Sequence, residues 1–306
     1  PRISFGAVNT ANASTAGNTL NVNVFKVAGN QGNIQINGTG GFHGFVNTTS
    51  PALIFGGSTT TVNLDIQGSF LLNNTSNAGV NLFSAGSGTG NAFNLTVDGD
   101  MLVRANLTFN GSIGNNAVFT GTCNNLTQTG AAFTFSSIGG TATGATTSFN
   151  TLNSVAFGGG NFNFQANTAT STTNTPTFNI GGNLSVSGAT VHFYPSTIDN
   201  LSANINITGG LRTSGGTITT SGSPMAIRRS TITFVGGGNH VWNGVVAGSR
   251  LALGSTIDFV VPATNTLQIT NSQLINGNLL VDGSLEFPTS PAVTFTLNGN
   301  LTGTGN

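Results

Sequence analysis

The chain has 306 residues, of which only 5% are charged, and its formal net charge at pH 7 is zero. This balance offers no basic footprint for nucleic acid and no basic patch for a membrane surface. Disorder is also a poor interpretation, because disordered chains combine low hydrophobicity with high charge, whereas 37% of these residues are apolar. The aromatic residues are 22 Phe, one Tyr and one Trp, and Phe belongs in a core because it has no polar group.

Short runs of alternating apolar residues, each followed by a corner that contains Gly or Asn, recur along the chain. Side chains on a strand alternate between its two faces, so the apolar residues of each run share one face. Gly and Asn then allow the turn, because Gly adopts positive φ without steric cost and Asn with little. In chain order, the clearest runs are 20–24, 34–38, 62–70, 93–103, 178–186, 205–211, 232–236, 274–281 and 293–301.

The spacing of the corners predicts a repeat architecture. The corner glycines fall into three groups with spacings of about 30, 27 and 22 residues. They are Gly38, Gly68 and Gly99, then Gly182, Gly209 and Gly236, and finally Gly277 and Gly299. A β-solenoid tolerates such drift, because extra residues leave the stack as loops at a corner. We therefore predict an all-β fold, a right-handed parallel β-helix with irregular coils of roughly 22–31 residues and essentially no α-helix.

We expect a single domain that covers residues 1–306, with a less regular region at 115–175 that is rich in Gly, Thr and Asn. Inward Val, Ile, Leu and Phe would form apolar columns along the axis, and outward Thr and Asn would form hydrogen-bonded rows. An antiparallel β-sandwich is the main alternative, because it also has short strands with frequent turns. The longer period and the matching corners favour the solenoid.

The two ends of such a stack would expose unpaired strand edges, which natural proteins cap with helices, charge or Pro. The sequence predicts no capping helix, and it starts at Pro1 without an initiator Met, which indicates a mature or trimmed chain. We expect either a segment of a longer protein or an open end that meets a partner. Head-to-tail contact between like subunits does not close, so it builds a filament. The expected assembly residues are Val293, Phe295, Leu297, Leu301, Ile3 and Phe5.

Two of the corner runs, GGNLSVSG at 181–188 and NGNLLVDG at 276–283, resemble the repeats of bacterial secreted β-solenoid proteins. That group includes surface adhesins, autotransporter-like passengers, filament-forming proteins and other Gly/Asn/Thr-rich repeat proteins exported to the cell surface. The resemblance implies a secreted, extracellular protein at a cell surface. The calcium-binding nonapeptide of another solenoid class is absent, because residues 158–161 (GGGN) lack its acidic ligand.

Two pairs of acids are close enough in sequence to suggest chemistry. Asp98 and Asp100 flank Gly99, and paired carboxylates can bind calcium or act in a glycosidase or lyase. This pair lies at a repeat corner where other copies carry Asn or Ser, so a structural role at the corner is favoured. Asp282 and Glu286 form the second pair, four residues apart, and a catalytic role is disfavoured there too.

The remaining reactive residues are scattered. His43, His192 and His240 are far apart and show no His-x-x-x-His or His-Glu pattern, so we expect each to be a strand or corner residue. Cys123 is the only cysteine. It cannot form a disulfide within the chain, and it is best interpreted as a small buried hydrophobe.

Two surface contacts are considered. Arg228 and Arg229, with Arg212 and Arg250 in neighbouring turns, form the densest positive cluster. They indicate either a solvated face or a contact with an acidic polysaccharide or the next subunit. Trp242 is a candidate surface contact because it is the only Trp, with core packing as the favoured alternative.

Together these patterns predict a non-enzymatic structural subunit of an extracellular filament or adhesive cell-surface rod that assembles head to tail through open solenoid ends. We expect no catalytic residue, cofactor or metal. The expected partners are further copies of the chain, with glycans or cell surfaces as other candidates. The alternative function is a polysaccharide-binding or polysaccharide-degrading β-helix protein, including the phage tail-spike type.

Overall fold

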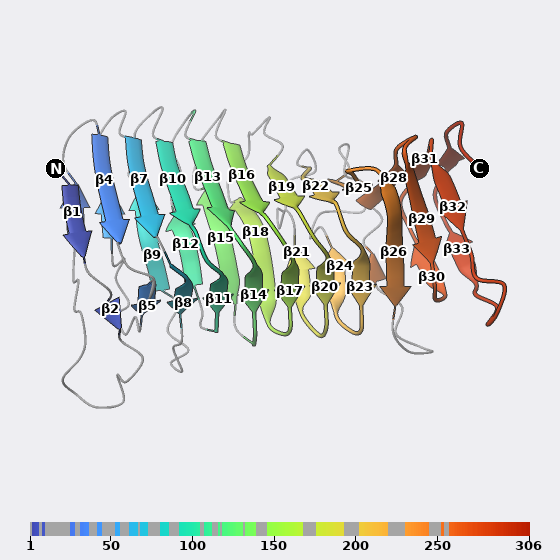
Figure 1. The fold of residues 1–306 in the computed structure, drawn as a ribbon, viewed down its shortest axis with the longest axis horizontal. Coiled ribbons are helices and arrows are strands. Elements are labelled where there is room, and N and C mark those ends of the chain that lie inside the picture. Colours follow the sequence, from blue (N-terminus) through green and yellow to red (C-terminus); the bar gives the residue numbers. More distant parts are fainter. Residues whose placement is uncertain are drawn as a thin grey trace.

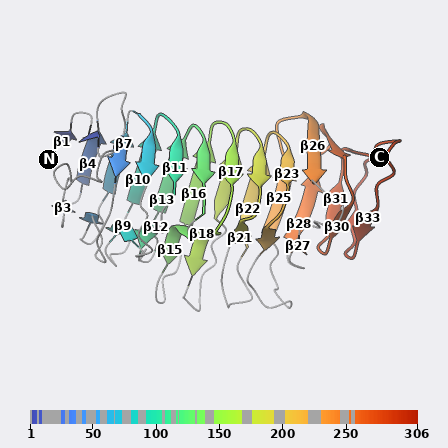
Figure 2. The same cartoon turned by 90° about the horizontal axis from the view of Figure 1, so that it is seen from below.

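The chain forms an elongated stack of parallel strands, with its two termini at opposite ends (Figure 1). The computed structural model assigns strands between residues 2 and 302. Side chains are described for residues 68–70, 92, 94–104, 116, 118–130, 132–135, 146–164, 176–192, 202–218, 230–244 and 257–306. A view turned by 90° shows that the stack continues without a break between its blue and red ends (Figure 2).

Three long sheets run along the stack, and all of their strand pairs are parallel. The first sheet contains β1 (Arg2–Phe5), β4 (Gln31–Ile36), β7 (Thr61–Ile66), β10 (Ala92–Val97), β13 (Val118–Cys123), β16 (Thr146–Thr151), β19 (Thr177–Ile180), β22 (Asn204–Ile207), β25 (Ser230–Phe234), β28 (Ile257–Val261), β31 (Leu279–Val281) and β34 (Leu301–Thr302). The second contains β2 (Val8–Asn9), β5 (Phe42–Gly44), β8 (Phe70–Leu72), β11 (Met101–Val103), β14 (Leu126–Gln128), β17 (Val155–Phe157), β20 (Leu184–Val186), β23 (Leu211–Thr213), β26 (Gly238–Gly244), β29 (Asn265–Ile269) and β32 (Ser284–Glu286).

The third sheet contains β3 (Phe25–Val27), β6 (Leu53–Phe55), β9 (Val80–Ala85), β12 (Leu107–Gly111), β15 (Phe133–Ile138), β18 (Asn161–Asn167), β21 (Thr190–His192), β24 (Thr217–Thr219) and β27 (Ala252–Leu253). A separate two-stranded sheet pairs β30 (Gln273–Ile275) with β33 (Phe295–Leu297). Strands three apart in the chain lie side by side, so each turn of the chain adds one strand to each face. This arrangement confirms the predicted parallel β-solenoid, and the described residues contain no α-helix.

The coil length varies along the stack. On the first sheet, Ile3 pairs with Ile34, a step of 31 residues, whereas Phe259 pairs with Leu279, a step of 20. The predicted range of roughly 22–31 residues therefore holds on this sheet except at that one coil. It is short because only three residues separate β28 from β29, β29 from β30 and β30 from β31.

The region at 115–175 was expected to be less regular, but its described strands stack like the others. β13 pairs in register with β16, and β16 with β19. The alternation of apolar residues is weaker in this region because small or polar residues occupy several inward positions. These include Gly121, Thr147 and Thr151, all of which are buried. The Thr-rich run at 167–176 lies mainly outside the described part of the chain.

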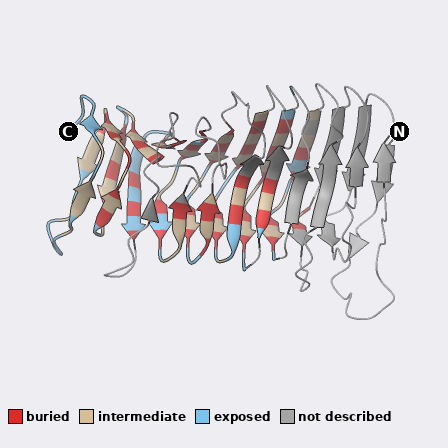
Figure 3. Cartoon of the chain, turned by 180° about the vertical axis from the view of Figure 1, so that it is seen from behind, coloured by how far each residue is buried: buried red, intermediate tan, exposed pale blue. Residues whose placement is uncertain are grey.

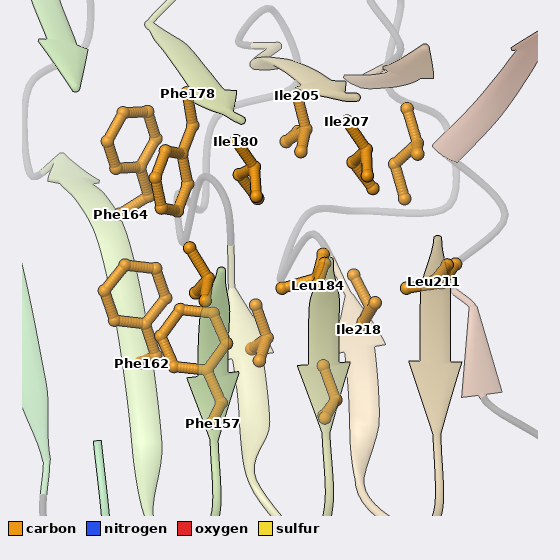
Figure 4. Packing of buried hydrophobic residues seen from close by; sticks show 14 of the residues in the cluster. Phe157, Phe162, Phe164, Phe178, Ile180, Leu184, Ile205, Ile207, Leu211 and Ile218 are labelled. Carbon is orange, nitrogen blue, oxygen red and sulfur yellow. The ribbon is translucent and has the colours of Figure 1, made fainter. Parts of the chain in front are cut away.

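Burial alternates along the strands, with one face of each strand directed into the stack (Figure 3). The inward side chains form one continuous apolar cluster between the sheets. Phe residues dominate its middle coils: the rings of Phe157 and Phe162 lie 4.2 Å apart, and those of Phe164 and Phe178 lie 5.0 Å apart. Aliphatic residues replace them in the next coils, as Figure 4 shows for Ile205 and Leu211. The stack is therefore held by apolar columns, as the sequence predicted.

Gly121 shows how closely these columns pack. It occupies an inward position of β13, and a Cβ atom built there would lie 2.3 Å from the ring of Phe149. Any larger residue would therefore displace Phe149, whose ring also lies 4.2 Å from that of Phe135. The absence of a side chain at this position makes room for the two rings.

The described residues include no helix that is long and apolar enough to span a membrane.

We expect Phe135→Ala to lower the free energy of unfolding by about 3–5 kcal/mol, because the Phe135 ring is fully buried and its loss leaves a cavity. Leu152→Ala is the control, because Leu152 is 64% exposed and its truncation should change little. Chemical denaturation of both variants measures the difference. Equal effects would contradict the description of the core.

Candidate functional site: the corners and the outer face of the first sheet

Polar side chains form a ladder where the first sheet turns into the second. At this corner a side-chain oxygen of one coil accepts the backbone N–H of the residue in the next coil. The bonds run from the N–H of Asp100 to Ser69 (3.1 Å), Asn125 to Asp100 (3.2 Å), Ser154 to Asn125 (3.0 Å), Asn183 to Ser154 (3.2 Å) and Gly210 to Asn183 (2.7 Å). We call these six residues the corner ladder. Each rung joins two coils, so the ladder bonds the stack along its axis.

The corner ladder gives Asp100, one member of the first acidic pair, a structural role. The Oδ1 atom of Asp100 accepts the backbone N–H of Asn125 and also the side-chain amides of Asn124 and Asn125, at 3.1 and 2.8 Å. Asp98 is exposed and makes no such bond to any residue that the structure describes. The two carboxylates therefore have different surroundings, and Asp100 serves the corner.

Three other acids among the described residues accept hydrogen bonds in the same way, each from a residue of another coil. Asp282 accepts the backbone N–H of Thr304 at 3.1 Å, and Glu286 accepts the side-chain amide of Gln268 at 2.8 Å. Asp258, which the sequence did not single out, accepts the backbone N–H of Asn278 at 2.7 Å. Among the described residues, no group of three or more His, Cys, Asp or Glu side chains could hold a metal ion.

Among the described reactive side chains, Cys123 lies near the carboxylate of Asp100. The Cys123 thiol is buried and donates to the backbone oxygen of Asn125 at 3.4 Å. Burial, with a smaller contribution from the charge of Asp100, raises its pKa far above the ordinary value, so the thiol is protonated and a poor nucleophile. Burial lowers the pKa of His192. The side chain of His43 lies outside the described residues.

Trp242 is a core residue, which confirms the favoured interpretation of core packing and excludes the candidate surface contact at this position. It occupies an inward position of β26, is fully buried, and stacks on Phe259 with ring centroids 4.8 Å apart and an interplanar angle of 11°. Arg212 is exposed on β23. Arg228 and Arg229 lie outside the described residues, so their predicted contact is not placed by the structure.

The expected assembly residues of the C-terminal coil are only partly buried. Phe295 and Leu297, on β33, and Val293 are half-buried. Leu301, on β34, is 64% exposed. For the other end, Ile3 and Phe5 lie on β1 and pair with Ile34 and Ile36 of β4, but their side chains are outside the described residues.

The outer face of the first sheet carries two rows of short polar side chains from β10 to β25. The register aligns Asn94, Thr120, Ser148, Thr177, Asn204 and Thr231 in one row and Thr96, Thr122, Asn150, Asn179, Asn206 and Thr233 in the other. We call this the two-row face. None of its twelve residues is charged. Because the strands repeat at about 4.8 Å, the face presents hydroxyl and amide groups at regular intervals.

Neighbouring groups within the rows bond to one another. The amide of Asn179 donates to Asn150 and that of Asn206 donates to Asn179, both at 2.7 Å. The hydroxyl of Thr231 donates to Asn204 at 3.0 Å. These contacts confirm the predicted hydrogen-bonded rows. The corner ladder is not among the features predicted from the sequence, although Ser, Asp or Asn at the same position of each corner would have indicated it.

The fold places the chain in the class of parallel β-solenoids. No family model, curated protein or solved structure matches the chain in comparisons with known proteins.

We expect Asp100→Ala to lower the free energy of unfolding by about 1–2 kcal/mol, because three N–H donors of the next coil lose their shared acceptor. Asp98→Ala is the matched control, one glycine away on the same corner, and should change stability by less than about 0.5 kcal/mol. Urea denaturation of both variants measures this. A larger loss from Asp98→Ala would mean that the corner ladder does not account for the acidic pair.

Proposed function

We propose that the chain is a non-enzymatic structural subunit of an extracellular filament or an adhesive cell-surface rod. The observation that supports this most directly is the bonding between coils. Three parallel sheets, the corner ladder and the continuous core all join each coil to the next along one axis. A stack bonded in this way resists extension and bending, and these properties suit a rod or filament.

The C-terminal coil supports the proposed assembly. Leu301 on β34 and Phe287 beside β33 are 64% and 45% exposed, and the Phe287 ring meets Phe295 edge-on at 5.6 Å. An exposed strand with apolar neighbours can pair with another parallel strand. We propose that β1 of a second copy, which carries Ile3 and Phe5, supplies that strand. Such head-to-tail contact does not close, so it leads to a filament.

The location outside the cell rests on the resemblance of 181–188 and 276–283 to the repeats of exported solenoid proteins. The two-row face gives an adhesive rod a neutral surface for contact. Its partners would be further copies of the chain, glycans or other cell-surface components.

Electron microscopy of the concentrated chain 1–306 tests the assembly. We expect fibres of uniform width for the unchanged chain and a strong reduction in fibre number for Leu301→Asp, which places a charge on the contact. Leu152→Asp is the matched control, because Leu152 is also 64% exposed but lies at a corner in the middle of the stack. Isolated monomers of the unchanged chain at high concentration would contradict the proposal.

The two-row face favours one alternative function, the binding of a neutral polysaccharide. A polysaccharide presents hydroxyl groups at regular intervals, and twelve uncharged residues on six adjacent strands offer matching donors and acceptors. Charged ligands would find little complementary charge on this face.

Co-sedimentation with microcrystalline cellulose and with chitin tests this alternative. We expect Thr177→Lys to reduce the bound fraction several-fold, because it places a long charged side chain in the two-row face. Ser185→Lys is the control, since Ser185 is half-buried in the same coil but on the second sheet. If the unchanged chain does not bind, or if both variants lose binding equally, polysaccharide binding through this face is rejected.

A further inference from the structure

The corner before β26 breaks a regular pattern of backbone bonds. In five successive coils, a corner residue donates its N–H to the carbonyl oxygen of the equivalent residue one coil earlier. These bonds run from Gly99 to Gly68, Asn124 to Gly99, Asn153 to Asn124, Gly182 to Asn153 and Gly209 to Gly182, at 2.9–3.0 Å. In the following coil, Gly236, Gly237 and Gly238 have φ values of 95°, 75° and 92°, a region that only glycine adopts without cost. The backbone takes a different path there.

At this corner the side chain of His240, in place of a backbone N–H, contacts the carbonyl oxygen of the preceding coil. It is an inward residue of β26 and is 1% exposed. Its Nδ1 atom lies 2.8 Å from the carbonyl oxygen of Gly209, the residue whose N–H is the last donor of the backbone series. Its Nε2 atom lies 2.8 Å from Oδ1 of Asn265 in the next coil. One buried ring therefore connects three coils.

The orientation of the Asn265 amide is set by its other contacts. The backbone N–H of Gly237 donates to Oδ1 at 2.9 Å, and Nδ2 faces the carbonyl oxygen of Pro262 at 3.4 Å. A flipped amide would place an NH2 group against the Gly237 N–H and an oxygen against the Pro262 oxygen. Oδ1 therefore faces His240, and both ring nitrogens of His240 face oxygen atoms that accept hydrogen bonds.

We propose that His240 is a proton-dependent joint between the coils at residues 209, 240 and 265. A neutral imidazole has a single N–H, so its second nitrogen would face an oxygen lone pair at 2.8 Å. Only the doubly protonated ring donates both bonds. Acidification would therefore strengthen the stacking at this joint, and neutral or alkaline pH would weaken it.

The charged groups on the adjacent strands do not replace this effect. β22, β25, β26 and β29 carry no charged residue, and neither do the corners 208–210, 235–237 and 262–264. Arg212 on β23 is exposed on the outer face, and Asp258 on β28 is half-buried and bonds to Asn278. The described ring neighbour is Phe234, with centroids 5.4 Å apart. Among the described residues, His240 therefore faces two oxygen acceptors and no carboxylate.

Thermal unfolding of the chain 1–306 and of His240→Gln, followed by circular dichroism from about pH 5 to about pH 8, tests the joint. Gln is uncharged throughout this range. A ring that must be protonated in the folded state stabilises the fold at acid pH, and the gain is lost as the pH rises through the histidine range. We expect the unchanged chain to melt roughly 2–4 °C above the variant at the acid end, and the difference to fall below half of that at the alkaline end.

His192→Gln is the matched control, because it should change in the opposite direction. Burial lowers the pKa of His192, so its neutral ring favours the fold above the pKa of the unfolded chain, and this contribution is lost as the pH falls. The melting difference for His192→Gln should therefore become more favourable to the unchanged chain as the pH rises. A pH-independent difference for His240→Gln, or one that follows His192→Gln, overturns the joint.

Nitrogen-15 NMR of histidine-labelled protein provides a second measurement that does not depend on the variant folding. At acid pH we expect one slowly exchanging ring with protons on both nitrogens, and its signals should be absent from His240→Gln if that variant folds. The absence of such a ring from the spectrum of the unchanged chain overturns the proposal.

Discussion

The stacking of each residue above its counterpart in the next coil is the constraint on which the rest of the structure depends. Parallel strands repeat at about 4.8 Å, so any side chain meets its equivalent at that distance along the axis. Charges repeated at this spacing would repel each other. Asn and Thr can instead bond to their neighbours, as Asn150, Asn179 and Asn206 do. The low charge content and the polar composition both follow from this geometry.

The same constraint explains why the acids do not form a reactive site in the described part of the chain. Asp100, Asp258 and Asp282 each accept a backbone N–H from the next coil, and their carboxylates serve the stack in the way that Asn and Ser do at other corners. An acid that replaces Asn in an axial ladder is a structural substitute. Closeness in sequence, as for Asp98 and Asp100, was therefore a poor guide to chemistry.

The period made the fold predictable from the sequence, whereas individual positions were less so. Alternation and corner spacing identify a solenoid because each coil repeats the same requirement for an apolar inner face. The pattern weakened at 115–175 because Gly121 and Thr147 occupy inward positions, and at Gly121 the rings of Phe149 and Phe135 fill the space. Trp242 was considered for the surface only because it is unique, and rarity carries no information about burial. The contacts of His240 depend on three coils and could not be read from local sequence.

A stack that contacts only its neighbours has a stability that is close to a sum of coil and interface terms. Its behaviour is therefore governed by the interfaces where the regular bonding changes. The three glycines at 236–238 end the backbone series that reaches Gly209, and the coil from Phe259 to Leu279 is the shortest on the first sheet. Both irregularities lie within one coil of His240. A titratable ring at this place would let pH act on the stack where its regular bonding is interrupted, while the Phe-rich coils before it, held by apolar contacts, would respond little.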